Sequence, residues 1–308
     1  VYSPEINDLA GEVNFLKTMP DGEILLSVAP NQLIGLQGNA MVAYDYGAED
    51  EVFTVLDVAE AETGAATHRL LLTQEGNTHS FRGVVGMAPT APMSNSSGVQ
   101  WHHVEAYADG LWVALGTHIS TPGADGSSPA TPDPRPVLGW ITWDGSDATP
   151  VLRNMRMFTT GMFHSFASSG DDLIVGGTVE SLIITSDEEV EPINVPAAMV
   201  VSDLEDTVWF IGALGSEGIS TYKNGVLEVH QLSRPVPVDV SDAGAQDAFI
   251  HVHGTDANGA PIQWSIDITA DGSIESGRGF LNLLFLLGGG ILLAMMLMYA
   301  VEQVKTSA

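Results

Sequence analysis

The sequence predicts an all-β region built from repeated four-stranded units and followed by one apolar helix. Two observations favour the β region: short hydrophobic strands recur after acidic or glycine turns, and no stretch before residue 279 keeps a 3.6-residue apolar period over more than three turns. A third observation predicts the helix, because residues 279–301 are apolar and uncharged. With 308 residues, the chain is long enough to bury a substantial core.

The repeat is a turn rich in Asp or Gly that precedes a short apolar strand, which is typical of a β-hairpin. Five copies are clear and a weaker sixth is Leu70-Leu71-Leu72. The strands of the clear copies begin at Ile24, Leu111, Leu173, Val208 and Phe249. With Leu70 included, consecutive strands begin about 35 to 62 residues apart, which is similar to the ~40 to 50 residues of a β-propeller blade.

The longest step contains residues 120–136, a stretch rich in Pro, Ser and Gly that we interpret as an inserted surface loop. After most marked strands come a second, alternating strand, a polar turn and a third strand, which predicts four strands per unit. These following strands are residues 137–143, 181–186, 218–222 and 262–269. In the first unit, residues 40–46 and 51–58 play this part, whereas residues 60–100 fit the pattern poorly.

The repeats therefore predict a β-propeller of about six blades, with a pair of stacked β-sandwiches as the rival fold. The phrase HSFASSGDDLIVGG, residues 164–177, resembles the blade opening of kelch-like, WD-repeat-like and quinoprotein-like propellers. This resemblance extends over about residues 12–276 and concerns architecture alone. The repeated signatures of those families are absent, so the resemblance assigns no functional residue.

Composition excludes several classes of function. The 39 acidic and 10 basic residues give a formal net charge of -29, which repels the phosphates of nucleic acids and anionic lipid headgroups. Acidic residues are spread through nearly every loop, which favours a saline habitat, with an acidic secreted domain from an ordinary organism as the alternative. The chain has no cysteine, so disulfides, thiolate metal sites and cysteine nucleophiles are excluded.

The apolar segment predicts a single-pass membrane anchor. About 23 residues at a rise of 1.5 Å per residue are enough to cross a ~30 Å hydrocarbon layer. We expect residues 1–278 to form an extracytoplasmic propeller domain, residues 279–301 to span a cell or envelope membrane, and residues 302–308 to form a short cytoplasmic tail. Gly290 and Ala294 are small residues four apart, which favours either close packing of a partner helix or a loosened single anchor.

Two further features agree with an outside location. The chain begins with Val1, which we interpret as the end left after removal of a signal peptide. Asn95 opens an Asn-Ser-Ser triplet, a glycosylation acceptor pattern of low specificity.

Candidate ligand-binding residues are His103 and His164, each eight or nine residues before a marked strand. Both are expected on the innermost strands of neighbouring blades, where they would bind a metal or an anion or, alternatively, fill the channel and hydrogen-bond to backbone. His251 and His253 share one face of a strand, but the sequence supplies no third metal ligand. The acidic turns at residues 144–147 and 256–259 offer oxygens to calcium, although neither completes a calcium loop.

No phosphate loop, nucleophile elbow or metalloprotease helix is present, so the sequence assigns no catalytic residue. The six tryptophans are expected to pack between blades, with an exposed subset that stacks on a sugar as the alternative. Our leading hypothesis is a non-catalytic surface module that binds a protein or glycan, as an accessory subunit of a membrane assembly. The alternative is a membrane-tethered hydrolase or lyase that acts on glycans at the channel mouth.

Overall fold

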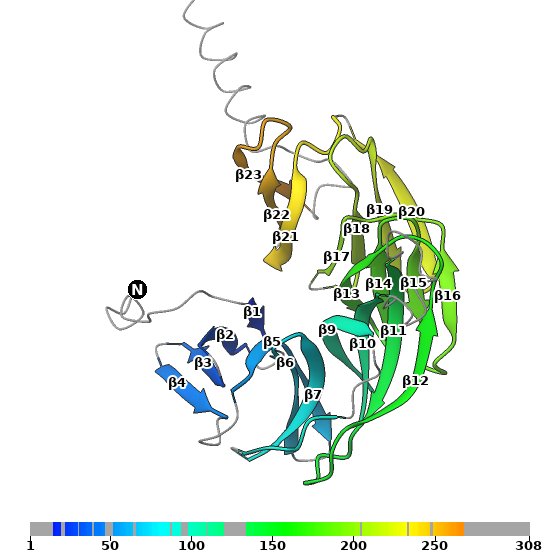
Figure 1. Ribbon diagram of the computed structural model, residues 1–308. Helices are drawn as coiled ribbons and strands as arrows, with labels where there is room; N and C mark the ends of the chain where they lie inside the picture. The colour runs from blue at the N-terminus through cyan, green and yellow to red at the C-terminus, as the bar shows by residue number, and fades with distance from the viewer. Residues whose placement is uncertain are drawn as a thin grey trace, which may run out of the picture. The chain divides into compact units, whose positions relative to one another are not determined.

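The computed structural model describes residues 15–19, 22–29, 31–38, 40–46, 52–63, 66–86, 88–93, 98–108, 110–119, 134–203, 205–232, 234–246 and 249–267 (Figure 1). These residues form 23 strands. Within these ranges there is no helix of the length and apolarity that crossing a membrane requires. The predicted anchor at residues 279–301, with Gly290 and Ala294, and the acceptor Asn95 lie outside the described residues.

The strands form six antiparallel sheets, and each sheet uses strands that are consecutive in the sequence. We number the sheets blade 1 to blade 6. Blade 1 contains β1 (Phe15–Thr18), β2 (Ile24–Ala29), β3 (Gln32–Gln37) and β4 (Ala40–Asp45); blade 2 contains β5 (Thr54–Thr63), β6 (Ala66–Glu75), β7 (Thr78–Val85) and β8 (Ala88–Pro89); blade 3 contains β9 (Val99–Ala108), β10 (Leu111–His118), β11 (Arg135–Thr142) and β12 (Val151–Met157).

Blade 4 contains β13 (Phe163–Ser169), β14 (Asp172–Gly177), β15 (Ser181–Ile184) and β16 (Val190–Ile193); blade 5 contains β17 (Met199–Ser202), β18 (Val208–Ile211), β19 (Gly218–Lys223) and β20 (Val226–Gln231); blade 6 contains β21 (Asp239–Gln246), β22 (Phe249–Thr255) and β23 (Pro261–Asp267). The described chain is therefore all-β and has six blades of the β-propeller type. It divides into two compact units: residues 1–166 with 171–196, which hold blades 1 to 4, and residues 167–170 with 197–308, which hold blades 5 and 6.

The hydrophobic core lies between the blades of each unit, because the middle strands are buried on both faces. In β10, Trp112 and Ala114 pack toward blade 2, whereas the alternate residues Leu111, Val113 and Leu115 pack toward blade 4. Successive side chains of a strand point to opposite faces, so an uninterrupted apolar run can fill two interfaces at once. Comparable clusters join blade 1 to blade 2 and blade 5 to blade 6.

The predicted repeat is confirmed, since all six marked strands are the second strand of a blade: β2, β6, β10, β14, β18 and β22. The preceding turns need a left-handed residue, supplied for example by Gly22 (φ 84°) and Asp206 (φ 60°). One boundary was wrong. The strand that begins within residues 51–58 is β5, which opens blade 2, because it pairs with β6 and not with β4.

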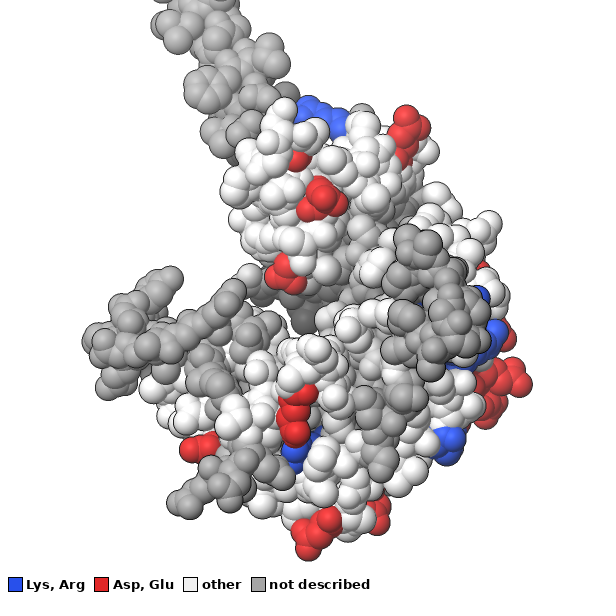
Figure 2. Space-filling model, viewed as in Figure 1, with Lys and Arg blue, Asp and Glu red and all other residues white. Residues whose placement is uncertain are grey.

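The structure corrects the end of the loop and confirms that the tryptophans pack between blades. The strand after the inserted loop begins at Arg135, so Pro136 belongs to β11 and not to the loop. All six tryptophans are buried, which removes the alternative of an exposed subset that stacks on a sugar: Trp101, Trp112, Trp140, Trp143, Trp209 and Trp264. Acidic side chains, by contrast, are spread over the surface, as the face in Figure 2 shows.

Candidate functional site around Asp57 and His103

The predicted histidines lie on first strands of the larger unit. His103 is on β9 of blade 3 and His164 is on β13 of blade 4. β5, the first strand of blade 2, lies beside both β1 and β9. In this fold the first strands therefore bring together residues that are far apart in the sequence.

His103 faces a carboxylate that the sequence analysis did not single out. Its Nδ1 atom lies 3.5 Å from Oδ2 of Asp57 on β5, and 46% of the His103 side chain is exposed. Asp57, in contrast, is buried. This pair is the part of the predicted site that combines a titratable base with an acid.

The Asp57 carboxylate is already engaged by the backbone. Its Oδ1 accepts the N–H of Val58 at 2.8 Å, and its Oδ2 accepts the N–H of Val104 on β9 at 2.9 Å. Lys17 on β1 lies 3.4 Å from Oδ1, so one carboxylate joins the first strands of blades 1, 2 and 3. We call Lys17, Asp57 and Val104 the first-strand clasp.

Electrostatics hold the clasp in its charged state. Burial raises the pKa of Asp57, but the charge of Lys17, the contact with His103 and the Val104 N–H together bring this pKa below its ordinary value. Burial likewise lowers the pKa of Lys17, and the carboxylates of Asp57 and Glu105 more than reverse that effect. Glu105 lies 3.1 Å from the Lys17 ammonium, which also donates to the Val104 carbonyl at 3.1 Å.

Two other histidines, on blades 2 and 3, also form hydrogen bonds. His102 on β9 contacts the Thr117 hydroxyl at 2.9 Å, and His79 on β7 contacts the Trp101 carbonyl at 2.6 Å. Burial, followed by repulsion from His103, His79 and His164, lowers the pKa of His102 to about 4. Burial and His103 also lower the pKa of His164.

This arrangement favours a structural role for Asp57. A general base needs a free lone pair within reach of its substrate, whereas both Asp57 oxygens accept hydrogen bonds from backbone. Within the described ranges, no group of three or more His, Asp or Glu side chains is arranged to hold a metal ion. The prediction that His103 and His164 bind a ligand remains a prediction.

A second buried ion cluster joins blades 1 and 2. The Arg69 guanidinium on β6 pairs with Glu60 on β5 and with Glu23, which lies just before β2. Tyr44 on β4 donates to Glu23 at 2.7 Å, and Arg69 stacks 4.5 Å above the Tyr44 ring. Arginine is rare in this chain, and a scarce basic residue within a strand pattern is the sequence signal that could have indicated the cluster.

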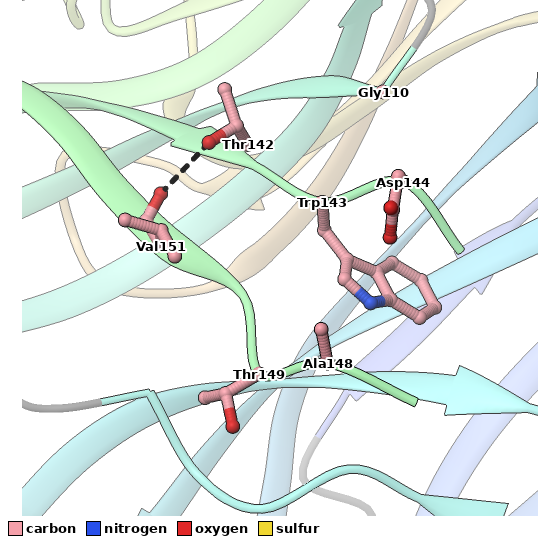
Figure 3. Close-up of a pocket in the computed structure, with 7 residues that line it drawn as sticks. All are labelled: Gly110, Thr142, Trp143, Asp144, Ala148, Thr149 and Val151. Atoms are coloured by element: carbon pink, nitrogen blue, oxygen red, sulfur yellow. Dashed lines mark hydrogen bonds between the residues drawn. The ribbon is translucent and has the colours of Figure 1, made fainter. Parts of the chain in front are cut away.

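A surface pocket lies at the loop between β11 and β12 in blade 3. It has a volume of about 420 Å³ and is lined by Gly110, Thr142, Trp143, Asp144, Ala148, Thr149 and Val151 (Figure 3). The Trp143 indole donates to the Ser146 carbonyl at 2.9 Å, and the Asp144 carboxylate accepts the Ser146 N–H at 3.0 Å. The polar groups of Trp143 and Asp144 therefore hold this loop in shape.

The turn at residues 256–259 and His251 are also engaged in local hydrogen bonds. In the turn at residues 256–259, Asp256 Oδ1 accepts the N–H groups of Asn258 at 2.8 Å and Ala260 at 2.9 Å, which is turn chemistry. His251 on β22 contacts the Ser265 hydroxyl at 3.0 Å. His253 lies two residues further on the same strand.

Comparison with known proteins supports the fold and no family. No protein-family model matches the chain, and neither does any curated protein. Among solved structures, the chain is similar to Kluyveromyces lactis Hsv2, with 9% identity over 85% of this chain and 76% of the other and a TM-score of 0.51. It is also similar to a functionally unknown protein from Desulfotomaculum acetoxidans, with 9% identity over 86% and 89% of the two chains and a TM-score of 0.50. Identity this low indicates a shared fold alone.

Proposed function

We propose that this chain is a non-catalytic β-propeller module that binds a protein partner at a membrane surface. The observation that carries the proposal is the distribution of side chains. On the first strands, titratable side chains such as Asp57 make contacts between blades. The outer strands, in contrast, expose apolar side chains. Exposed apolar groups at a rigid surface are typical of a protein interaction site.

The membrane part of the proposal rests on the sequence. Residues 279–301 are long and apolar enough for one span, which would hold the blades on the outer side of a cell or envelope membrane. The expected outcome of removing residues 279–308 is a soluble protein with unchanged β content, measured by circular dichroism after expression without detergent. An insoluble product, or a full-length chain that stays in the soluble fraction, would argue against an anchor.

The partner is tested by cross-linking the full-length chain in its native membrane and then isolating it. We expect one protein to be recovered in a fixed ratio with the chain, and size-exclusion chromatography to show a single complex. A chain that is recovered alone at every cross-linker concentration would contradict the binding-module proposal.

A glycan-active hydrolase or lyase is the second candidate, and a specific observation favours it: half-exposed His103 lies 3.5 Å from Asp57. If that pair performed acid-base chemistry, His103→Gln would abolish turnover of a glycan while leaving the fold intact. Assay against a panel of acidic and neutral polysaccharides tests this candidate, and inactivity of the wild-type chain on all of them would count against it.

A further inference from the structure

The outer strand of blade 5 exposes three large apolar side chains, more than any other outer strand in the described chain. In β20, Val226 is 57% exposed, Leu227 39% and Val229 73%. By comparison, β4 exposes two, Met41 and Val42, at 42% and 43%. Removing apolar surface from water is favourable, so the exposure of three such side chains on one short strand calls for a physical reason.

The backbone of this strand is also available for pairing. Leu232 donates to the Glu217 carbonyl at 2.9 Å, and the register from Gly218 to Gln231 continues without a shift. Because backbone groups alternate along an antiparallel pair, Leu227, Val229 and Gln231 point their N–H and C=O groups away from β19. No described residue pairs with that side of β20.

Three other outer strands, β8, β12 and β16, carry features that hinder pairing with a foreign chain. β8 has only two residues and includes Pro89, and β16 contains Glu191 and Pro192. In β12, a register shift interrupts the ladder, and the Asn154 side chain occupies the N–H of Met155 at 2.8 Å. Proteins normally protect edge strands in these ways, whereas β20 has six residues, no proline and no register shift, and Glu228 is its one acidic side chain.

We propose that β20 is the docking edge for an extended segment of another protein, which adds to blade 5 as a further antiparallel strand and alternates apolar with basic side chains. Each outward-facing residue can exchange two backbone hydrogen bonds with such a segment. Leu227 and Val229 provide apolar cross-strand contacts on one face. This inference rests on the proposed binding function and names its site.

Charge determines which occupant fits. Glu228 on β20 and Glu217 beside it are exposed, and Lys223 at the turn already pairs with Glu205 at 3.2 Å. A second copy of the chain would bring a net charge of -29 against an equal charge. A segment with Lys or Arg between its apolar residues complements this edge and is attracted by the whole molecule.

The test measures binding of a fluorescein-labelled peptide of alternating valine and lysine to the full-length chain, by fluorescence anisotropy in about 0.3 M salt, where nonspecific attraction is screened. A peptide with the same residues in two blocks and a peptide of alternating valine and glutamate are the probe controls. We expect saturable binding of the valine-lysine alternation and weak binding of both controls. Equal binding of the block peptide would overturn the strand-addition proposal.

Val229→Pro is the decisive variant, since it removes an outward N–H and leaves the bonds to β19 in place. We expect affinity for the alternating peptide to fall about tenfold or more. Ala43→Pro makes the same change at an outward position of β4 and should leave affinity unchanged. Val229→Lys, which needs no backbone change, should weaken binding because it replaces an apolar cross-strand contact with a charge, so the proposal remains testable if the proline variant misfolds.

The remaining outcomes distinguish failure of the β20 docking site from failure of the proposed binding function. If Val229→Lys still co-purifies with a cross-linked membrane partner as the wild type does, β20 is not the docking edge, although the module stands. If the wild type captures no partner, the binding function fails. If β20 instead mediates a dimer that Val229→Lys dissociates, the occupant is a second copy and the basic-segment proposal is wrong.

Discussion

Asp57 shows how one buried carboxylate can organise three blades. Its buried oxygens accept the Val58 and Val104 N–H groups and pair with the partly exposed Lys17. An unpaired charge or an unsatisfied donor would be costly at this position. The residue is therefore better explained as an architectural element than as the acid of an active site.

Replacing Asp57 tests that interpretation. Asp57→Ala leaves the Val58 and Val104 N–H groups without their acceptor and removes one of the two carboxylates beside Lys17. We expect a loss of about 3 kcal/mol in the free energy of unfolding, measured by urea denaturation at pH 7. Because the folded-state pKa of Asp57 is lowered, this stabilisation is present above the unfolded pKa of about 4 and is lost as the pH falls further. A wild-type advantage that stays constant down to pH 2 would contradict the assignment.

The lowered pKa of His102 predicts a second pH dependence of the protein's stability. The pKa of His102 falls to about 4 in the folded protein, whereas an unfolded histidine titrates at about 6.5, so the unfolded chain binds more protons between these values. Stability should therefore decrease as the pH is lowered from about 6.5 to about 4. In denaturation midpoints taken across this range, His102→Gln should flatten the decrease, and the control His251→Gln on blade 6 should not.

At the level of single elements, the interface between blades 2 and 3 depends on a close approach of backbone to an indole. A Cβ atom on Gly83 of β7 would lie 2.2 Å from the Trp143 ring. The ring also packs beside Trp112, at 5.8 Å between centroids, and edge-on to His68, at 5.7 Å. A buried ring with these neighbours has little room to move.

Gly83→Ala should therefore destabilise the larger unit by about 1–3 kcal/mol through overpacking. Gly244→Ala on β21 is the matched control, because nothing lies within 4 Å of the position that a Cβ atom would take there. Thermal unfolding followed by tryptophan fluorescence compares the two variants. Similar melting temperatures for both would mean that Trp143 can shift at no cost.

Across the molecule as a whole, 39 acidic residues and 10 basic residues make self-repulsion a general property of the surface. Salt screens this repulsion, with a Debye length that falls from about 10 Å at 0.1 M to about 3 Å at 1 M. We expect the melting temperature to rise with potassium chloride over this range. Sucrose at matched osmolality is the control, and a melting temperature independent of salt would argue against adaptation to a saline habitat.

The strands, their order and the number of blades could be predicted from the amino-acid sequence. Hairpin turns and period-two apolar runs depend on neighbouring residues, so Asp206 before Val208 or Gly22 before Ile24 is visible without a structure. Residues 60–100 fit the repeat poorly because β5 and β6 are long and mix charged with apolar residues, as Glu60 and Arg69 show. Those charges are buried against each other, which local patterning does not reveal.

The contacts of the candidate residues could be found only in the folded chain. The hydrogen bonds of the first-strand clasp join residues 40, 47 and 87 positions apart, and these separations carry no local signal. The sequence placed His103 on a first strand, but its acidic neighbour came from another blade. Likewise, the open edge of β20 is a property of the sheet, because a strand is an edge only in relation to the strands that pair beside it.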